Sequence, residues 1–175
     1  MSYKNSLLLP FCLYIGGEEM KRKSWNDYFM GIAFATSERC SCFSESKGAV
    51  LVKDGRIIST GYNGAPAGIT TCVDEGKCRK RSLGFGHGEG HSECKAVHAE
   101  ANAILSAAKI GISTDGCILY CTHKPCEDCT KILIQAGIKR IYYAKEYKSN
   151  FSDELIKESG IELFHINEGD EKVVD

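Results

Sequence analysis

The sequence predicts an α/β fold, a three-layer α-β-α sandwich around a mixed five-stranded sheet. Over the second half of the chain, segments with helical apolar spacing alternate with short apolar runs typical of strands, and a hairpin pattern precedes them. The chain has 175 residues, of which 43% are hydrophobic and 26% charged, so it can bury a substantial core. We expect one domain over residues 21–175, preceded by an N-terminal extension at 1–20.

The first regular element is predicted to be a helix from Ser24 to about Ser37. Ser24 is a favourable N-cap residue, and Asp27 follows three positions later as its capping-box partner. Near-helical spacing is kept by the large apolar side chains Trp25, Tyr28, Phe29, Ile32 and Phe34.

A β-hairpin is expected next, with strands at 48–53 and 56–61. They flank Asp54-Gly55, a dipeptide that accepts the positive φ angles of a two-residue hairpin turn.

A glycine-rich, poorly periodic insert at about 62–97 separates this hairpin from the remaining elements. A loop of that length inside a compact domain usually has a function of its own. The elements expected after it are helix 98–109, strand 117–121, helix 126–136, strand 139–144, helix 152–158 and strand 161–165.

Charge and cysteine content narrow the function classes. The net charge is −1, and long nucleic acids usually select basic surfaces, so we expect a small-molecule partner and no nucleic acid polymer.

The apolar stretch 6–16 is too short for the ~20 residues of a membrane span, and we see no convincing signal peptide. The ten cysteines are therefore expected to be reduced, several of them bound to metal, in a cytoplasmic protein.

Two short motifs, each at the start of a predicted helix, point to a metal centre. His98-Ala99-Glu100 opens one helix, and Pro125-Cys126-Glu127-Asp128-Cys129 opens the next. One imidazole and two thiolates suit a catalytic zinc ion, which keeps three protein ligands and an open position for water. Zinc lowers the pKa of that water, and Glu100 is placed to move its proton to a ring nitrogen and then to a leaving amine. The pattern H-x-E … P-C-x-x-C is typical of zinc-dependent nucleobase deaminases.

Other readings of these cysteines stay open. The same three ligands could form a zinc site without catalysis, although a closed structural site would use a fourth Cys or His. Cys117 and Cys121 alternate along a predicted strand, and we interpret both as core residues.

Between Ser24 and Tyr147 the chain resembles the deoxycytidylate (dCMP) deaminases of the cytidine deaminase-like superfamily. The segments that carry the resemblance are Ser24–Met30, Gly48–Val52, Gly61–Pro66, His98–Ile104 and Cys121–Cys129. The resemblance implies the cytidine deaminase-like fold, zinc on His98, Cys126 and Cys129, Glu100 as proton shuttle, and deamination of dCMP to dUMP for dTMP synthesis.

The resemblance also implies a set of substrate contacts, at Asn63, Ala99, Lys47 and Tyr147. Asn63 is the candidate for the sugar hydroxyl, with turn formation as the alternative. Before Gly48 the family commonly has a basic residue near the substrate phosphate and a small apolar residue next to the glycine, and here the run 44–47, Ser-Glu-Ser-Lys, departs from that pattern. Lys47 is the candidate that takes over the phosphate contact, where Glu45 would repel the same group. Tyr147 is either a substrate-side residue or an ordinary partly buried tyrosine.

Regulation and assembly are implied by the same resemblance. It predicts a homo-oligomer, most plausibly a hexamer, activated by dCTP and inhibited by dTTP, with Mg²⁺ accompanying the effector. The allosteric site would include Gly61, Tyr62, Asn63 and Gly64.

A second, structural zinc is expected on Cys42, Cys72, Cys78 and Cys94, as in similar dCMP deaminases. Four thiolates would close a tetrahedral site and hold a glycine-rich insert that has little apolar material. His87 or His91 could replace Cys78, and free thiols in the insert are the alternative to any metal.

Different functions remain as alternatives to dCMP deamination. They are a deaminase acting on dCTP, on a modified cytosine nucleotide or on tRNA adenine, and a catalytically silent zinc-binding interaction module. The neutral composition disfavours RNA, and an intact Glu100 disfavours the silent module.

Overall fold

A computed structural model of the chain describes residues 22–86, 89–167 and 170–173. The expected extension at 1–20 and His87 lie outside the described residues. The helices are α1 (Trp25–Ser37), α2 (Cys72–Glu75), α3 (Arg79–Ser82), the 3₁₀ turn η1 (His91–Glu93), α4 (Ala99–Lys109), α5 (Glu127–Gln135) and α6 (Asn150–Ser159). The strands are β1 (Gly48–Lys53), β2 (Arg56–Tyr62), β3 (Ile118–His123), β4 (Arg140–Lys145), β5 (Glu162–Asn167) and β6 (Asp170–Val173).

One mixed sheet organises the fold, in the order β2-β1-β3-β4-β5-β6. β1 pairs antiparallel with β2 and β3, whereas β3, β4 and β5 are parallel to one another. Parallel neighbours need a crossover connection, and α5 and α6 supply the two that join β3 to β4 and β4 to β5.

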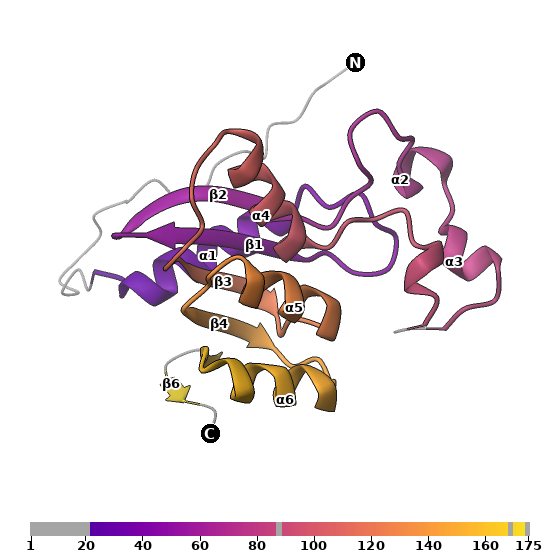
Figure 1. The fold of residues 1–175 in the computed structure, drawn as a ribbon. Coiled ribbons are helices and arrows are strands. Elements are labelled where there is room, and N and C mark those ends of the chain that lie inside the picture. The colour runs from indigo at the N-terminus through magenta and orange to yellow at the C-terminus, as the bar shows by residue number, and fades with distance from the viewer. Residues whose placement is uncertain (1–21, 87–88, 168–169, 174–175) are drawn as a thin grey trace, which may run out of the picture.

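Helices cover both faces of this sheet, as the predicted sandwich requires (Figure 1). On one face α1 packs through Phe29, Met30 and Ala33 against Val50, Tyr120 and other strand residues. On the other face α4, α5 and α6 pack on the alternate strand positions, among them Leu51, Leu119 and Ile141. The apolar run of β1 is therefore buried on both faces, since its neighbouring residues point to opposite layers.

Local sequence signals produce the first elements as predicted. The backbone N–H of Asp27 donates to Ser24 Oγ at 3.1 Å, so Ser24 is the N-cap of α1. Asp54 and Gly55 have φ angles of 50° and 71°, and Lys53 pairs with Arg56, which is the geometry of a tight hairpin turn.

Two features of the fold differ from the sequence prediction. A sixth strand, β6, adds antiparallel to β5; its Asp-Glu-Lys-Val sequence lacks the apolar alternation by which strands are recognised. The insert also contains α2, α3 and η1, elements too short to show a helical period. A capping box between Thr71 and Asp74 starts α2.

Contacts join the two ends of the insert and also link its inner segments to one another. An antiparallel bridge joins Gly64 to Val97, the two ends of the segment. Ion pairs connect Arg79 with Glu93, at 2.7 Å, and Lys95 with Glu75. In Figure 1 α2 and α3 lie beyond one end of the sheet, to the side of the main body.

Candidate metal centre and substrate pocket

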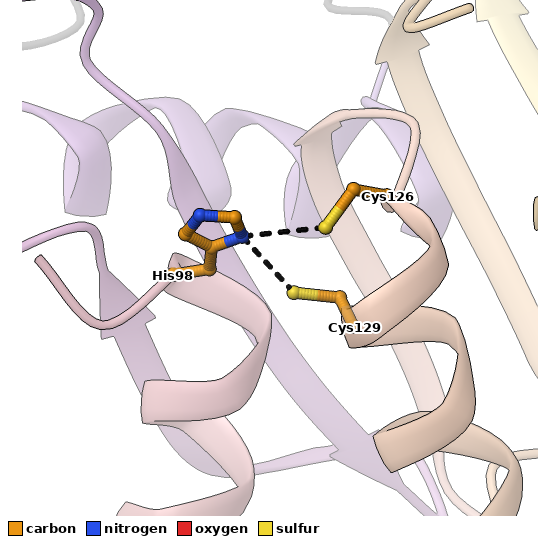
Figure 2. A group of neighbouring side chains, drawn as sticks. All are labelled: His98, Cys126 and Cys129. Carbon is orange, nitrogen blue, oxygen red and sulfur yellow. Dashed lines mark hydrogen bonds between the residues drawn. The ribbon is translucent and has the colours of Figure 1, made fainter. Parts of the chain in front are cut away.

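Three side chains from two helix starts meet at one point. His98 is the N-cap residue of α4 and Cys126 that of α5, with Cys129 one turn further into α5. The Nδ1 atom of His98 lies 3.4 Å from the Sγ atoms of both Cys126 and Cys129 (Figure 2). Among the described residues, only this set brings three candidate ligand atoms of His, Cys, Asp or Glu within 4.8 Å of one another.

The start of α5 is held in place by α6. Ser152 is fully buried and its hydroxyl donates to the Pro125 carbonyl at 2.9 Å. The same hydroxyl lies 2.8 Å from Thr130 Oγ1, and Ser149 donates to Glu127 at 2.9 Å. These bonds fix the corner from which both cysteines project toward His98.

Glu100 is buried beside the cluster. Its side chain is 5% exposed, and Cys129 Sγ lies 3.6 Å from its Oε2 atom. Burial raises the pKa of Glu100 above the ordinary carboxyl value, since a charge is poorly solvated there. A raised pKa makes the protonated form of a carboxyl group easier to reach, which suits a residue that takes up and releases protons.

The electrostatics favour a thiolate at Cys126, whereas the hydrogen bond to Cys126, and after it burial, raises the pKa of Cys129. A hydrogen bond from Cys129, and after it one from His98, lowers the pKa of Cys126 to about 3 despite burial. The hydrogen bond to Cys126 likewise raises the pKa of His98. Thiolate is the form of cysteine that binds metal, and both sulfurs lie at the positive end of the α5 dipole.

The donor set fits zinc. One imidazole nitrogen and two sulfurs are the ligands of a catalytic zinc site with an open fourth position. His98, Cys126 and Glu100 also line a pocket, so this open side faces a space for a substrate.

Three predicted substrate residues line the same pocket: Lys47, Asn63 and Tyr147. The ammonium of Lys47 lies 5.3 Å from the centre of the Tyr147 ring, a cation–π distance. Ala99, the first residue of α4, does not line the pocket; it is 1% exposed and belongs to the core between α4 and the sheet.

Asn63 uses its side chain within the chain. Its Oδ1 accepts from the backbone N–H of Lys47 at 2.8 Å, and its Nδ2 donates to the backbone carbonyl of Glu45 at 2.8 Å. The amide therefore clamps the loop before β1, which is closer to the turn-forming alternative. One N–H of the amide is left by these two bonds and can face a ligand.

The predicted allosteric residues lie around Asn63. Gly61 is in β2, where an added Cβ would come within 2.2 Å of the Ala99 carbonyl oxygen, so only glycine allows α4 this close. Tyr62 is 37% exposed, and Gly64 bridges to Val97.

The four cysteines predicted for a second zinc lie in or beside the insert, but no three of their sulfur atoms come within 4.8 Å of one another. Cys42, Cys78 and Cys94 line the wall of the pocket, and Cys72 is 6% exposed. Burial, and then the nearby thiol groups of Cys78, Cys42 and Cys94, raises the pKa of Cys72. The Ser44 backbone N–H donates to Cys42 Sγ at 3.4 Å.

Sequence reasoning missed several lining residues. Lys80 and Arg81, from α3, bring positive charge to the pocket, and Lys124 adds a cation paired with Asp153 at 2.5 Å. Glu45 also lines the pocket and accepts from His123 at 2.8 Å. In the sequence, the polar pair Thr122-His123 before Pro125 could have indicated this contact, but the spacing does not predict which residue His123 would meet.

Comparison with known proteins agrees with this geometry. The family profile described as "Cytidine and deoxycytidylate deaminase zinc-binding region" matches residues 23–145. ComE operon protein 2 of Bacillus subtilis (strain 168) is 43% identical over 158 residues, 89% of this chain and 78% of that protein. The deoxycytidylate deaminase of Mycobacterium phage D29 is 42% identical over 132 residues, 73% of this chain and 99% of that protein.

A solved structure has the same fold. The crystal structure of dCMP deaminase from the cyanophage S-TIM5 in complex with dCMP and dUMP superposes with a TM-score of 0.65. It is 33% identical in sequence, and the match covers 80% of this chain and 95% of that chain. Of the helices in the described ranges of our chain, none has the length and apolar character needed to cross a bilayer.

Proposed function

The chain belongs to the cytidine and deoxycytidylate deaminase family, and from this premise we propose that it hydrolyses dCMP to dUMP and ammonia, supplying dUMP for dTMP synthesis. The observation that carries the proposal is the pocket in which His98, Cys126, Cys129 and the buried Glu100 converge. A similar protein binds dCMP and dUMP in its crystal structure.

In the proposed reaction some residues of the chain bind zinc and the nucleotide, and Glu100 transfers protons. His98, Cys126 and Cys129 would hold zinc, which supplies a Lewis acid that lowers the pKa of a water molecule toward neutrality. Glu100 would take one proton from that water and deliver it to the ring nitrogen beside C4. As the water oxygen bonds to C4 and the C4–N bond breaks, the second water proton would pass through Glu100 to the departing amine, which leaves as ammonia. Its raised pKa suits both transfers, because burial makes the protonated form of the carboxyl easier to reach. Lys47, Asn63 and Tyr147 would contact the sugar and phosphate at the pocket wall, with the backbone of Ala99 adding a contact at the start of α4.

The structural zinc is proposed for Cys42, Cys72, Cys78 and Cys94, within a domain spanning 21–175 with a zinc-held insert at about 62–97. Two observations support it: Cys42, Cys78 and Cys94 line one wall of the pocket, and the Ser44 backbone N–H donates to Cys42 Sγ at 3.4 Å. Backbone N–H donors to sulfur stabilise thiolates. His91 also lines the pocket and stays the alternative to Cys78.

Assembly and regulation rest on resemblance alone. We propose a homo-oligomer, a hexamer, activated by dCTP with Mg²⁺ and inhibited by dTTP through Gly61, Tyr62, Asn63 and Gly64. A cytoplasmic location fits the free cysteines, which as metal ligands need a reducing compartment.

A parallel ultraviolet deamination assay tests the proposed substrate. The zinc-loaded chain receives cytidine, deoxycytidine, dCMP, dCTP and a tRNA substrate. We expect dCMP to have the highest kcat/KM. A preference for dCTP or tRNA would reassign the substrate, and inactivity on all five, with zinc bound, would favour the interaction module.

A further inference from the structure

A hydrogen-bonded chain behind the pocket wall ends at Lys47. Glu45 Oε1 lies 2.8 Å from His123 Nε2, and His123 Nδ1 lies 2.9 Å from Thr122 Oγ1. Thr122 Oγ1 accepts from the backbone N–H of Gly48 at 3.1 Å. The second carboxylate oxygen of Glu45 lies 3.5 Å from the ammonium of Lys47.

The direction of each bond follows from donor chemistry. A carboxylate only accepts, so His123 donates from Nε2 to Glu45. Burial and the positive charge of Lys47 lower the pKa of His123, which favours the neutral ring, in which Nδ1 is an acceptor. Thr122 must then donate its hydroxyl proton to Nδ1 while its oxygen accepts from Gly48. The neutral His123 tautomer with its proton on Nε2 satisfies every hydrogen bond in this chain.

Burial makes this chain rigid. Thr122 is 1% exposed and His123 4%, so both side chains are fixed by surrounding protein. The main chain of the loop is fixed as well, because the Asn63 amide bridges Glu45 and Lys47. Glu45 is the partly exposed residue at one end of this otherwise buried hydrogen-bonded chain.

The carboxylate of Glu45 is therefore held next to the ammonium of Lys47. One carboxylate oxygen is engaged by His123 and the other faces the ammonium. Tyr147 contacts Lys47 through its ring, so a carboxylate and an aromatic ring hold the ammonium at the pocket. A lysine stem held in this way loses less conformational freedom when an anion binds.

We propose that Thr122, His123 and Glu45 are positioning residues that hold Lys47 at the pocket to bind the 5′-phosphate of the nucleotide. Glu45, which the sequence presents as a source of repulsion, becomes part of the phosphate-binding arrangement through its partners. The inference rests on the proposed function, since it assigns specificity for a nucleotide over a nucleoside within the same pocket.

The test compares binding and turnover in matched variants. His123→Leu removes the donor to Glu45, whereas His123→Gln keeps an N–H near the Nε2 position. We expect His123→Leu to raise KM for dCMP about tenfold with a much smaller effect on kcat, and to weaken dUMP binding by calorimetry similarly. His123→Gln should restore both values to within about threefold of the parent. Zinc content, measured for each variant, excludes loss of the nearby metal centre as the cause.

A double-mutant cycle separates positioning from packing. If His123 acts through Lys47, then adding His123→Leu to Lys47→Met changes the dUMP affinity less than twofold. The same tenfold loss in both backgrounds, or failure of His123→Gln to rescue, would overturn the inference. A parent chain that neither deaminates dCMP nor binds dUMP would instead contradict the proposed function. Lys109→Met, at the far end of α4, controls for the loss of one positive charge.

Discussion

Replacing Gly61 with alanine should destabilise the protein through α4, the helix that begins at the metal centre. The added Cβ would lie 2.2 Å from the Ala99 carbonyl oxygen and 2.3 Å from the Ala103 amide nitrogen. Both are backbone atoms, so neither can move without moving the helix. Ser59 further holds α4 there, because its hydroxyl donates to the Ala103 carbonyl at 2.8 Å.

The size of the effect follows from the overlap. Overpacking a core costs about 1–3 kcal/mol, and an overlap with helix backbone belongs at the upper end, about 3 kcal/mol. For a chain of this length each kcal/mol shifts Tm by roughly 2–4 °C, so Tm should fall by about 6–12 °C. Activity should fall too, because α4 carries His98 and Glu100.

Thermal unfolding of the zinc-loaded protein by circular dichroism measures this change. Gly31→Ala is the matched control: Gly31 lies in α1, is exposed and has no atom near the added Cβ. Alanine there improves helix propensity by about 1 kcal/mol and should raise Tm slightly. A Gly61→Ala protein that melts within about 2 °C of the parent would refute the packing argument.

The remaining predictions concern catalysis, the second zinc, the assembly and its regulation. Glu100→Gln should keep zinc yet lose roughly 10²–10⁴-fold in kcat, since an amide cannot relay protons; Glu158→Gln, exposed on α6, is the control. Activity within tenfold of the parent, a barrier change of only about 1.4 kcal/mol, would remove Glu100 from the mechanism. Elemental analysis should find two zinc ions per chain, falling to one in Cys72→Ser with the insert newly sensitive to protease; a single zinc in the parent argues against the second site. Light scattering should give a hexamer, and dCTP should raise and dTTP lower dCMP turnover; a 19.2 kDa monomer, or rates indifferent to both nucleotides, would contradict these expectations.

The secondary structure and the metal cluster were accessible to sequence reasoning because both depend on local spacing. Ser24 caps its helix and Asp54-Gly55 turns its hairpin through contacts within a few residues. His98 follows the insert and Cys126 follows a strand, and each lies at the start of a helix. Helix starts favour the thiolate form of cysteine, and side chains there project beyond the end of the helix. The prediction of zinc needed only ligand types and two motifs.

The short elements were not accessible in the same way. α2 and α3 are single turns, held by a capping box and by ion pairs such as Arg79–Glu93 rather than by a periodic apolar face. β6 consists mostly of charged residues, and its place follows from pairing with β5. Apolar periodicity cannot identify a helix that spans barely one turn, or a strand that lacks alternating apolar residues.

The sequence by itself determined the α/β class, the order of the main elements and the residues of the proposed zinc centre. Only the tertiary structure decided what surrounds that centre. Glu45 and His123 are 78 positions apart, yet their contact converts an apparent repulsion into support for Lys47. Lys80 and Arg81 reach the pocket only because the insert folds back beside the site. Such contacts arise from the packing of distant segments, where local pattern carries no information about which side chains will meet.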